Sequence, residues 1–353
     1  MDIIELAIAL VVILVGASLF TNGIEWFGRK LNLAEGAVGS VLAAIGTALP
    51  ETMIPVIAIL FGGRGSDPAA AHDVGVGAIL GAPFMLSTLA LFVTGIAVLA
   101  YSRRRKSARQ IVVDGRVLGM DLRYFFVGYA IALGSALVPP DLTVLRYAAL
   151  VLLIGIYAWY VKSHFEADPD VDAEDLAPLR LHRIDRRAHR ADPGVPRLRV
   201  VNLQVLIALG MIIGGAVVFV QAIEHMASGA GLDPVLLALI IAPIATELPE
   251  TTNSIIWVGQ GKDTLAMGNI TGAMVFQSCI PTAIGVVLAA DAWTISEASL
   301  LGFVSAAITF VSMVVIFWPA MRGRALSGVR LLAGGLFYVV YIGLVLARLS
   351  GLL

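Results

Sequence analysis

Two short and nearly identical stretches place acidic residues inside long apolar runs. They read GTALPE at residues 46–51 and ATELPE at residues 245–250. In each stretch a threonine precedes a glutamate by four positions, so a hydroxyl and a carboxylate would share one helix face. Hard cations bind oxygen atoms of these kinds, and the spacing therefore indicates a cation site. The candidate side-chain ligands are Thr47, Glu51, Thr246 and Glu250.

The prolines of these stretches add backbone oxygens to the candidate site. Proline has no amide hydrogen and clashes with the carbonyl four residues before it. Pro50 and Pro249 would therefore each free one carbonyl, and Pro55 and Pro243 would do the same nearby. Inside a bilayer such carbonyls need another partner or a polar cavity, and a bound cation is such a partner.

The second stretch carries an extra acid, because Glu247 stands where the first has Ala48. A charged side chain at the centre of a bilayer costs about 2.5–3.5 kcal/mol on insertion scales, so three carboxylates are not expected there as accidents of packing. The apolar runs hold almost no Lys or Arg that could pair with them. The less favoured alternative is that these glutamates are protonated or paired structural residues.

The composition indicates which environment surrounds the motifs. Of the 353 residues, 59% are hydrophobic and 14% are charged, and the mean hydropathy is +0.91. An average soluble domain has about 25% charged residues, so the chain is predicted to be a polytopic helical membrane protein. The only cysteine, Cys279, excludes an intrachain disulfide framework and a multi-cysteine metal site.

Apolar runs of about 20 residues predict ten membrane-spanning helices. Their expected ranges are 3–24, 36–61, 75–101, 124–138, 143–163, 200–226, 233–258, 264–290, 296–319 and 327–349. All Lys and Arg residues except Arg64, Arg146 and Arg348 fall in or beside the odd-numbered loops. The positive-inside bias therefore places these loops in the cytoplasm and both termini outside.

The two halves of the chain repeat each other. Residues 16–51 align without gaps with residues 215–250, and GAILGAPFML at 77–86 aligns with GNITGAMVFQ at 268–277. Each half has five predicted helices, an odd number, so the second half would enter the membrane the other way up. Inverted repeats are an architecture of secondary transporters, whose site lies near the midplane where the repeats meet.

The expected fold is therefore an all-α integral membrane protein with ten helices in two inverted five-helix repeats. Residues 1–163 form the first repeat and residues 200–353 the second. The hydrophilic loop at 164–199 joins them. It lacks the residue spacing of an EF-hand, and we interpret it as a solvated cytoplasmic linker.

Glycines in the third and eighth helices favour close packing of helix backbones. The pairs, each four residues apart, are Gly77 with Gly81 and Gly268 with Gly272. Close approach of the eighth helix would bring polar side chains towards the glutamates. These side chains are Asn269, Gln277 and Ser278, and for Ser278 a role in packing is as well supported as a role in binding.

At these residues the chain resembles the cation/calcium exchanger superfamily, specifically the prokaryotic sodium/calcium antiporters. The family's first motif reads G-T-S-L-P-E, and the resemblance covers essentially the whole chain. It implies alpha motifs at 43–88 and 242–285, and a contribution to sodium binding from backbone carbonyls near Ala44 and Pro243. The complete set of candidate ligands is Glu51, Glu250, Thr47, Thr246, Glu247, Gln277, Asn269, Ala44 and Pro243.

Several positions depart from the pattern of this family. The serine after the motif threonine is Ala48 in one copy and Glu247 in the other. The second motif, G-S-N-I-F-N/D, becomes GAPFML and GAMVFQ, so its serines are alanines and its last residue is Leu86 or Gln277. Fewer sodium-type ligands with retained carboxylates leave proton coupling, or a divalent ion other than calcium, as alternatives.

The resemblance implies an antiporter that exchanges calcium for sodium by alternating access, with the first and sixth helices sliding past the core. Proton-coupled exchange of calcium or another divalent cation is the alternative, and a channel is less favoured. An enzyme is not expected, because the predicted spans lack a histidine cluster, a Gly-x-Ser-x-Gly motif and paired aspartates. The expected partners are membrane lipid and the transported calcium and sodium ions, with no cofactor and no nucleic acid. We expect a monomer or weak homo-oligomer in the cell membrane.

Overall fold

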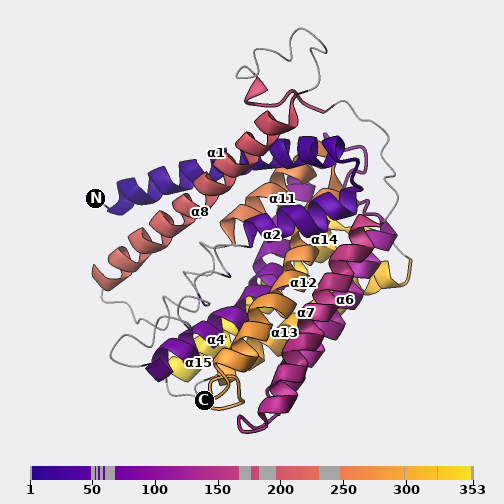
Figure 1. Cartoon of the computed structure of the whole chain (residues 1–353). Helices are drawn as coiled ribbons and strands as arrows, with labels where there is room; N and C mark the ends of the chain where they lie inside the picture. Colours follow the sequence, from indigo (N-terminus) through magenta and orange to yellow (C-terminus); the bar gives the residue numbers. More distant parts are fainter. Residues whose placement is uncertain are drawn as a thin grey trace.

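The computed structural model of the chain is a bundle of long helices (Figure 1). It describes residues 2–48, 52, 55, 59, 68–166, 176–182, 196–229, 247–297, 299–323 and 325–350. Among the described residues, eight helices are long and apolar enough to cross a membrane. The prediction of a multi-pass helical membrane protein is therefore confirmed.

The described elements follow the predicted order of spans. In the first half they are α1 (Asp2–Lys30), the π-helix η1 (Ala37–Ala43), α2 (Ala44–Thr47), α4 (Pro68–Met85), η3 (Leu86–Ala90), α5 (Leu91–Ala100), β1 (Gln110–Ile111), α6 (Gly115–Ser135) and α7 (Thr143–Phe165). In the second half they are α8 (Leu198–Gly229), α11 (Leu248–Gln260), α12 (Asp263–Leu288), α13 (Leu300–Met321), β2 (Leu326–Ser327), α14 (Gly328–Leu331) and α15 (Ala333–Leu349). The two short strands pair antiparallel and so join the two halves.

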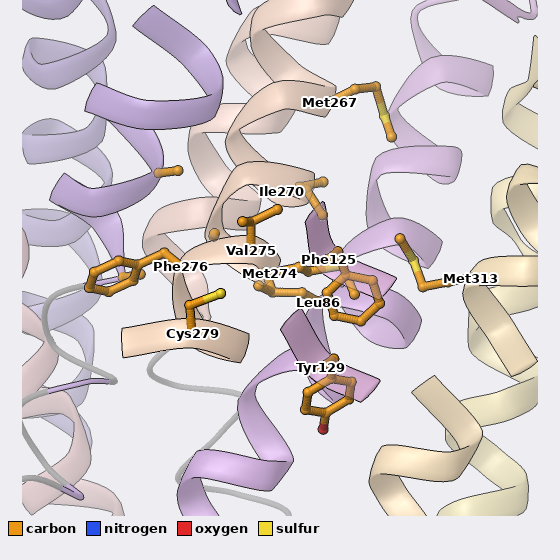
Figure 2. Close-up of a cluster of buried hydrophobic side chains, with 14 of the residues drawn as sticks. Leu86, Phe125, Tyr129, Met267, Ile270, Met274, Val275, Phe276, Cys279 and Met313 are labelled. Atoms are coloured by element: carbon orange, nitrogen blue, oxygen red, sulfur yellow. The ribbon is translucent and has the colours of Figure 1, made fainter. Parts of the chain in front are cut away.

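Helix α12 lies at the centre of the bundle. In its apolar stretch 83% of the residues are buried, against 22% in α7. It contacts α4, α6, α7, α11 and η1. Its residues Ile270 and Met274 belong, with Leu86 and Phe125, to the main apolar core (Figure 2). The less buried helices instead expose apolar side chains such as Val144, which suits contact with lipid.

Helices α1 and α8 lie against one another along much of their length (Figure 1). A Cβ atom on Gly16 would lie 3.1 Å from the side chain of Ile212, and one on Gly215 would lie 2.8 Å from that of Ile13. Both glycines therefore let the two backbones come close. Since these glycines occupy matching positions in the sequence repeat, the α1–α8 contact uses the same position from each half.

Helix α6 begins at Gly115, whereas hydropathy predicts a start at 124. Its N-cap is Asp114, whose side chain accepts a hydrogen bond from the Arg116 N–H at 2.7 Å. The prediction of this boundary is wrong because the extra turns contain charged residues that lower the hydropathy. One of them, Asp121, is fully buried and has hydrogen-bond partners on other helices.

Part of the loop between the two halves packs on α1 and α8. The side chain of Leu179 is 1% exposed and clusters with Trp26 and Val201. The indole N–H of Trp26 donates to the Ala177 carbonyl at 2.9 Å. Within residues 176–182 the linker is therefore held against two helices at Leu179 and the Ala177 carbonyl, while most of these residues stay exposed.

Candidate functional site

Both motif copies lie at helix ends. Helix α2 ends at Thr47, and the next residue, Ala48, has φ −78° and ψ 1°. Helix α11 begins with Glu247 as its N-cap and Pro249 in its first turn, where the missing N–H needs no partner. Pro249 thus lies in the first turn of α11, and the earlier part of the helix predicted over 233–258 lies outside the described residues.

The side chain of Asn269 connects the two motif copies. Thr47 Oγ1 lies 3.3 Å from Asn269 Oδ1, and Asn269 Nδ2 donates to the Glu250 carbonyl at 3.2 Å. All three residues are fully buried. Thr47 Oγ1 also lies 3.0 Å from the Ala43 carbonyl oxygen and 3.5 Å from that of Ala44, so its single hydrogen has three acceptors in reach. The structure thus brings three of the predicted ligand residues together at one point.

The start of α11 adds further buried polar groups beside this contact. Glu247, Glu250 and Asn253 follow one another at intervals of three residues and are 3%, 0% and 0% exposed. Among the described residues, neither carboxylate oxygen of Glu247 and neither amide atom of Asn253 has a hydrogen-bond partner. Buried polar groups are costly without partners. A cation would supply one to the Glu247 carboxylate.

The close backbone approach predicted for the eighth helix is confirmed. A Cβ atom on Gly272 would overlap the carbonyl oxygen of Ser40, and one on Gly268 would lie 2.6 Å from Ser40 Oγ. Helices η1 and α12 therefore cross in direct contact, and this crossing places Asn269 next to α2. For Gly77 and Gly81 the prediction is not tested, because the segment that the repeat would place against them, around Leu239, lies outside the described residues.

Two further predicted residues of α12 lie away from Asn269. Gln277 is buried, but it follows Asn269 by eight residues, which is about 12 Å along a helix. Ser278 faces α6, because its Oγ would lie 3.4 Å from a Cβ atom on Gly128. Of the two roles considered for Ser278, the structure therefore supports packing.

The remaining candidate ligands are placed in part. The Ala44 carbonyl accepts the Ala48 N–H at 3.0 Å, an ordinary helical hydrogen bond, and the Thr47 hydroxyl lies 3.5 Å from the same oxygen. Glu51, Thr246 and Pro243 lie outside the described residues. Within the described ranges, no group of three or more His, Cys, Asp or Glu side chains could hold a metal ion.

The sequence contained a signal that we did not use in selecting site residues. Asp121 lies three residues before the predicted start of the fourth span, and acidic residues at membrane depth are rare and commonly functional. It lay outside the predicted span, so hydropathy assigned it to a loop.

A buried polar site at the centre of a helical membrane bundle, built from two copies of one motif, is the arrangement of an ion transporter. The chain belongs to the sodium/calcium exchanger protein family, whose model matches residues 2–162 and 201–350. The resemblance identified from the motifs is therefore confirmed. The protein is accordingly a transmembrane cation antiporter.

Individual relatives support the same assignment. The "Putative antiporter CaxA" of Alkalimonas amylolytica is 23% identical over 340 residues, which cover 95% of each chain. The "Inner membrane protein YrbG" of Escherichia coli (strain K12) is 25% identical over 261 residues, which cover 71% of this chain and 69% of that one. The solved structure of the sodium-calcium exchanger NCX_Mj matches with a TM-score of 0.69 at 17% identity and covers 97% of both chains. This likeness shows that the fold is shared.

Proposed function

We propose that this protein exchanges calcium for sodium across the cell membrane by alternating access. The observation that carries the proposal is the buried contact of Thr47 with Asn269, whose amide also donates to the Glu250 carbonyl. This contact joins the end of one motif helix to the start of the other. An ion bound beside it would be held by ligands from both halves of the chain.

We assign the divalent ion to the motif glutamates, Glu51 and Glu250. Glu247 would add a third carboxylate, and Asn269 and Gln277 would add amide oxygens. Thr47 and Thr246, with backbone carbonyls near Ala44 and Pro243, would complete the sodium ligands. The chemistry fits both ions, because calcium takes six to eight oxygen ligands in flexible geometry.

Exchange follows from shared ligands. Two opposed carboxylates can neutralise one divalent ion or ions of lower charge, but they cannot hold both well at the same time. We propose that the ten helices form two inverted five-helix repeats with both termini outside the cell. The paired helices α1 and α8 would then move as one unit past the core to expose the site to each side in turn.

The test is calcium flux in proteoliposomes under an imposed sodium gradient. Glu51→Gln and Glu250→Gln should each abolish sodium-driven uphill calcium movement, because each removes a charge needed for the divalent ion. Glu297→Gln is the matched control, since Glu297 is exposed and lies outside the motifs. Full exchange in both motif variants would overturn the proposal.

A second candidate function is proton-coupled exchange of calcium or another divalent cation. It is favoured by the extra carboxylate of Glu247, which has no hydrogen-bond partner among the described residues. The absence of hydroxyls at Ala48 and Ala273 points the same way. Imposing sodium, proton and potassium gradients in turn separates the candidates. Calcium movement that only runs down its own gradient would instead indicate a channel.

A further inference from the structure

A second buried polar cluster lies near the ion site, and the proposed function does not use it. At its centre is Asp121 of α6, which is fully buried. Its Oδ2 accepts hydrogen bonds from Ser40 Oγ at 2.9 Å and Thr271 Oγ1 at 2.5 Å. Its Oδ1 accepts one from the Tyr160 hydroxyl at 2.9 Å and lies 3.0 Å from His164 Nε2.

The partners of Asp121 come from three other elements. Ser40 lies on η1, Thr271 on α12, and Tyr160 and His164 on α7. Helices α6, α7 and α12 pack side by side (Figure 1). The Tyr160 hydroxyl also lies 3.1 Å from the Ser40 carbonyl oxygen. One carboxylate therefore fastens η1, α7 and α12 to α6.

The cluster does not have the character of a second cation site. A carboxylate offers about four acceptor positions. Three hydroxyl groups and a histidine nitrogen occupy those of Asp121. A cation could bind only by displacing these donors. Saturation with donors instead suits a group whose task is to fix the positions of its partners.

Two partners of Asp121 lie on the segments that carry candidate ligands. Ser40 precedes Thr47 by seven residues along the continuous helix of η1 and α2, or about 10 Å. Thr271 follows Asn269 by two residues on α12. The two segments cross at Ser40 with no room for a side chain between them. Any slip of this crossing would change the 3.3 Å contact of Thr47 with Asn269.

The polar residues of this cluster are not repeated in the other half of the sequence. In the sequence alignment Ser40 matches Leu239, and Thr271 matches Leu80. Both matching residues are leucines, whose side chains cannot donate a hydrogen bond to a carboxylate. Hydrogen bonds fix a register through their direction, whereas apolar contacts tolerate small shifts.

We propose that Asp121 is a positioning residue for ion exchange, which holds η1 and α12 in the register that brings Thr47 and Asn269 together. The inference rests on the proposed function, because Thr47 and Asn269 are ligands only if the motif site binds the transported ion. Asp121 does not touch the ion. Its loss should therefore weaken ion binding without removing a ligand.

The experiment measures the KM for calcium and the maximal exchange rate of the purified protein in proteoliposomes. Asp121→Asn keeps the shape of the side chain but puts an N–H₂ group where two donors point. We expect the KM for calcium to rise about tenfold, since hydrogen bonds to a charged acceptor are among the stronger ones. Asp263→Asn is the control, because it also alters a buried aspartate but lies in an ion pair with Arg105.

Ser40→Ala and Thr271→Val serve if Asp121→Asn does not fold, since each removes one donor only. Each should raise the KM about threefold, because each removes one of the hydrogen bonds that hold the crossing. The positioning role alone would be overturned if all of these variants fold and keep an unchanged KM while the separate variant Glu250→Gln abolishes exchange. Exchange that survives Glu250→Gln would overturn the proposed function instead. The same KM change in Asp263→Asn would show a general loss of stability and would also overturn the positioning role.

Discussion

Thr47 Oγ1 lies 3.3 Å from Asn269 Oδ1, although 222 residues separate the two in the chain. Asn269 also donates to the backbone carbonyl of Glu250, so one amide touches both copies of the repeated motif. The side chain is fully buried. The geometry of the candidate ion site therefore depends on this asparagine as much as on the glutamates.

Replacement of Asn269 tests this dependence. Asn269→Leu fills a similar volume but removes both hydrogen bonds, and it leaves the Glu250 carbonyl without its amide donor. We expect the affinity for calcium to fall at least about tenfold, on the scale of one lost buried hydrogen bond and one lost oxygen ligand. Calcium-dependent shifts of the thermal unfolding midpoint in detergent would measure it. Asn202→Leu on the exposed side of α8 is the matched control and should leave the shift unchanged.

Glu247 tests whether the second motif copy sets the ion preference. Glu247→Ser introduces the serine that the exchanger family motif has at this position and removes one buried carboxylate. The affinity for divalent cations should fall about tenfold relative to sodium, because divalent ions depend more on the charge of their ligands. Competition between calcium and sodium in flux assays gives the ratio directly. An unchanged ratio would show that Glu247 does not face the ion.

The crossing of η1 and α12 predicts a specific effect of a single methyl group. Gly272→Ala would place a Cβ atom against the Ser40 carbonyl oxygen, so the helices would have to move apart. We expect a loss of about 1–3 kcal/mol in the free energy of unfolding. Gly210→Ala is the control, because a Cβ atom there meets nothing within 4 Å. Alanine is the better helix former, so this variant should be as stable as the original or slightly more stable, as measured by thermal unfolding.

A buried ion pair ties the loop after α5 to the start of α12. Both guanidinium NH₂ groups of Arg105 bond to the Asp263 carboxylate at 2.7 Å, and one also donates to the Val258 carbonyl at 2.7 Å. Arg105→Met would leave the Asp263 charge buried without its partner, at a cost of about 3–5 kcal/mol. Arg104→Met, an exposed neighbour, should change the unfolding temperature little. Equal unfolding temperatures for the two variants would contradict the structural importance of this pair.

Much of the fold could be predicted because the signals are local. A run of about 20 apolar residues specifies a membrane helix whatever packs beside it. Helices α7 and α13 therefore begin and end close to their predicted ranges. The prediction failed at α6, where Asp121 lowers the hydropathy of a helix in which it is nevertheless buried. Its four partners lie on other elements, and no local property of the sequence reveals them.

The candidate site also has features that local sequence signals predict and features that they do not. The sequence was enough to select Thr47 and Asn269 as candidate ligands on their helices. The small residues Gly268 and Gly272 indicated that the eighth helix packs closely against another helix. Which atoms meet at that crossing could not be predicted. Ser278, six residues beyond Gly272 on the same helix, faces α6 instead of the glutamates. A rotation of α12 by a fraction of a turn decides this difference.

The sequence by itself determined that this protein lies in a membrane, that its halves repeat, and that two polar motifs interrupt its apolar helices. These properties depend on residue type and on spacing along one helix. Only the tertiary structure decided that Asn269 joins the two motifs, that Asp121 holds the crossing beside them, and that residues 176–182 pack on α1 and α8. Such contacts depend on which helices become neighbours and how they are rotated, and this is set by the packing of the whole bundle.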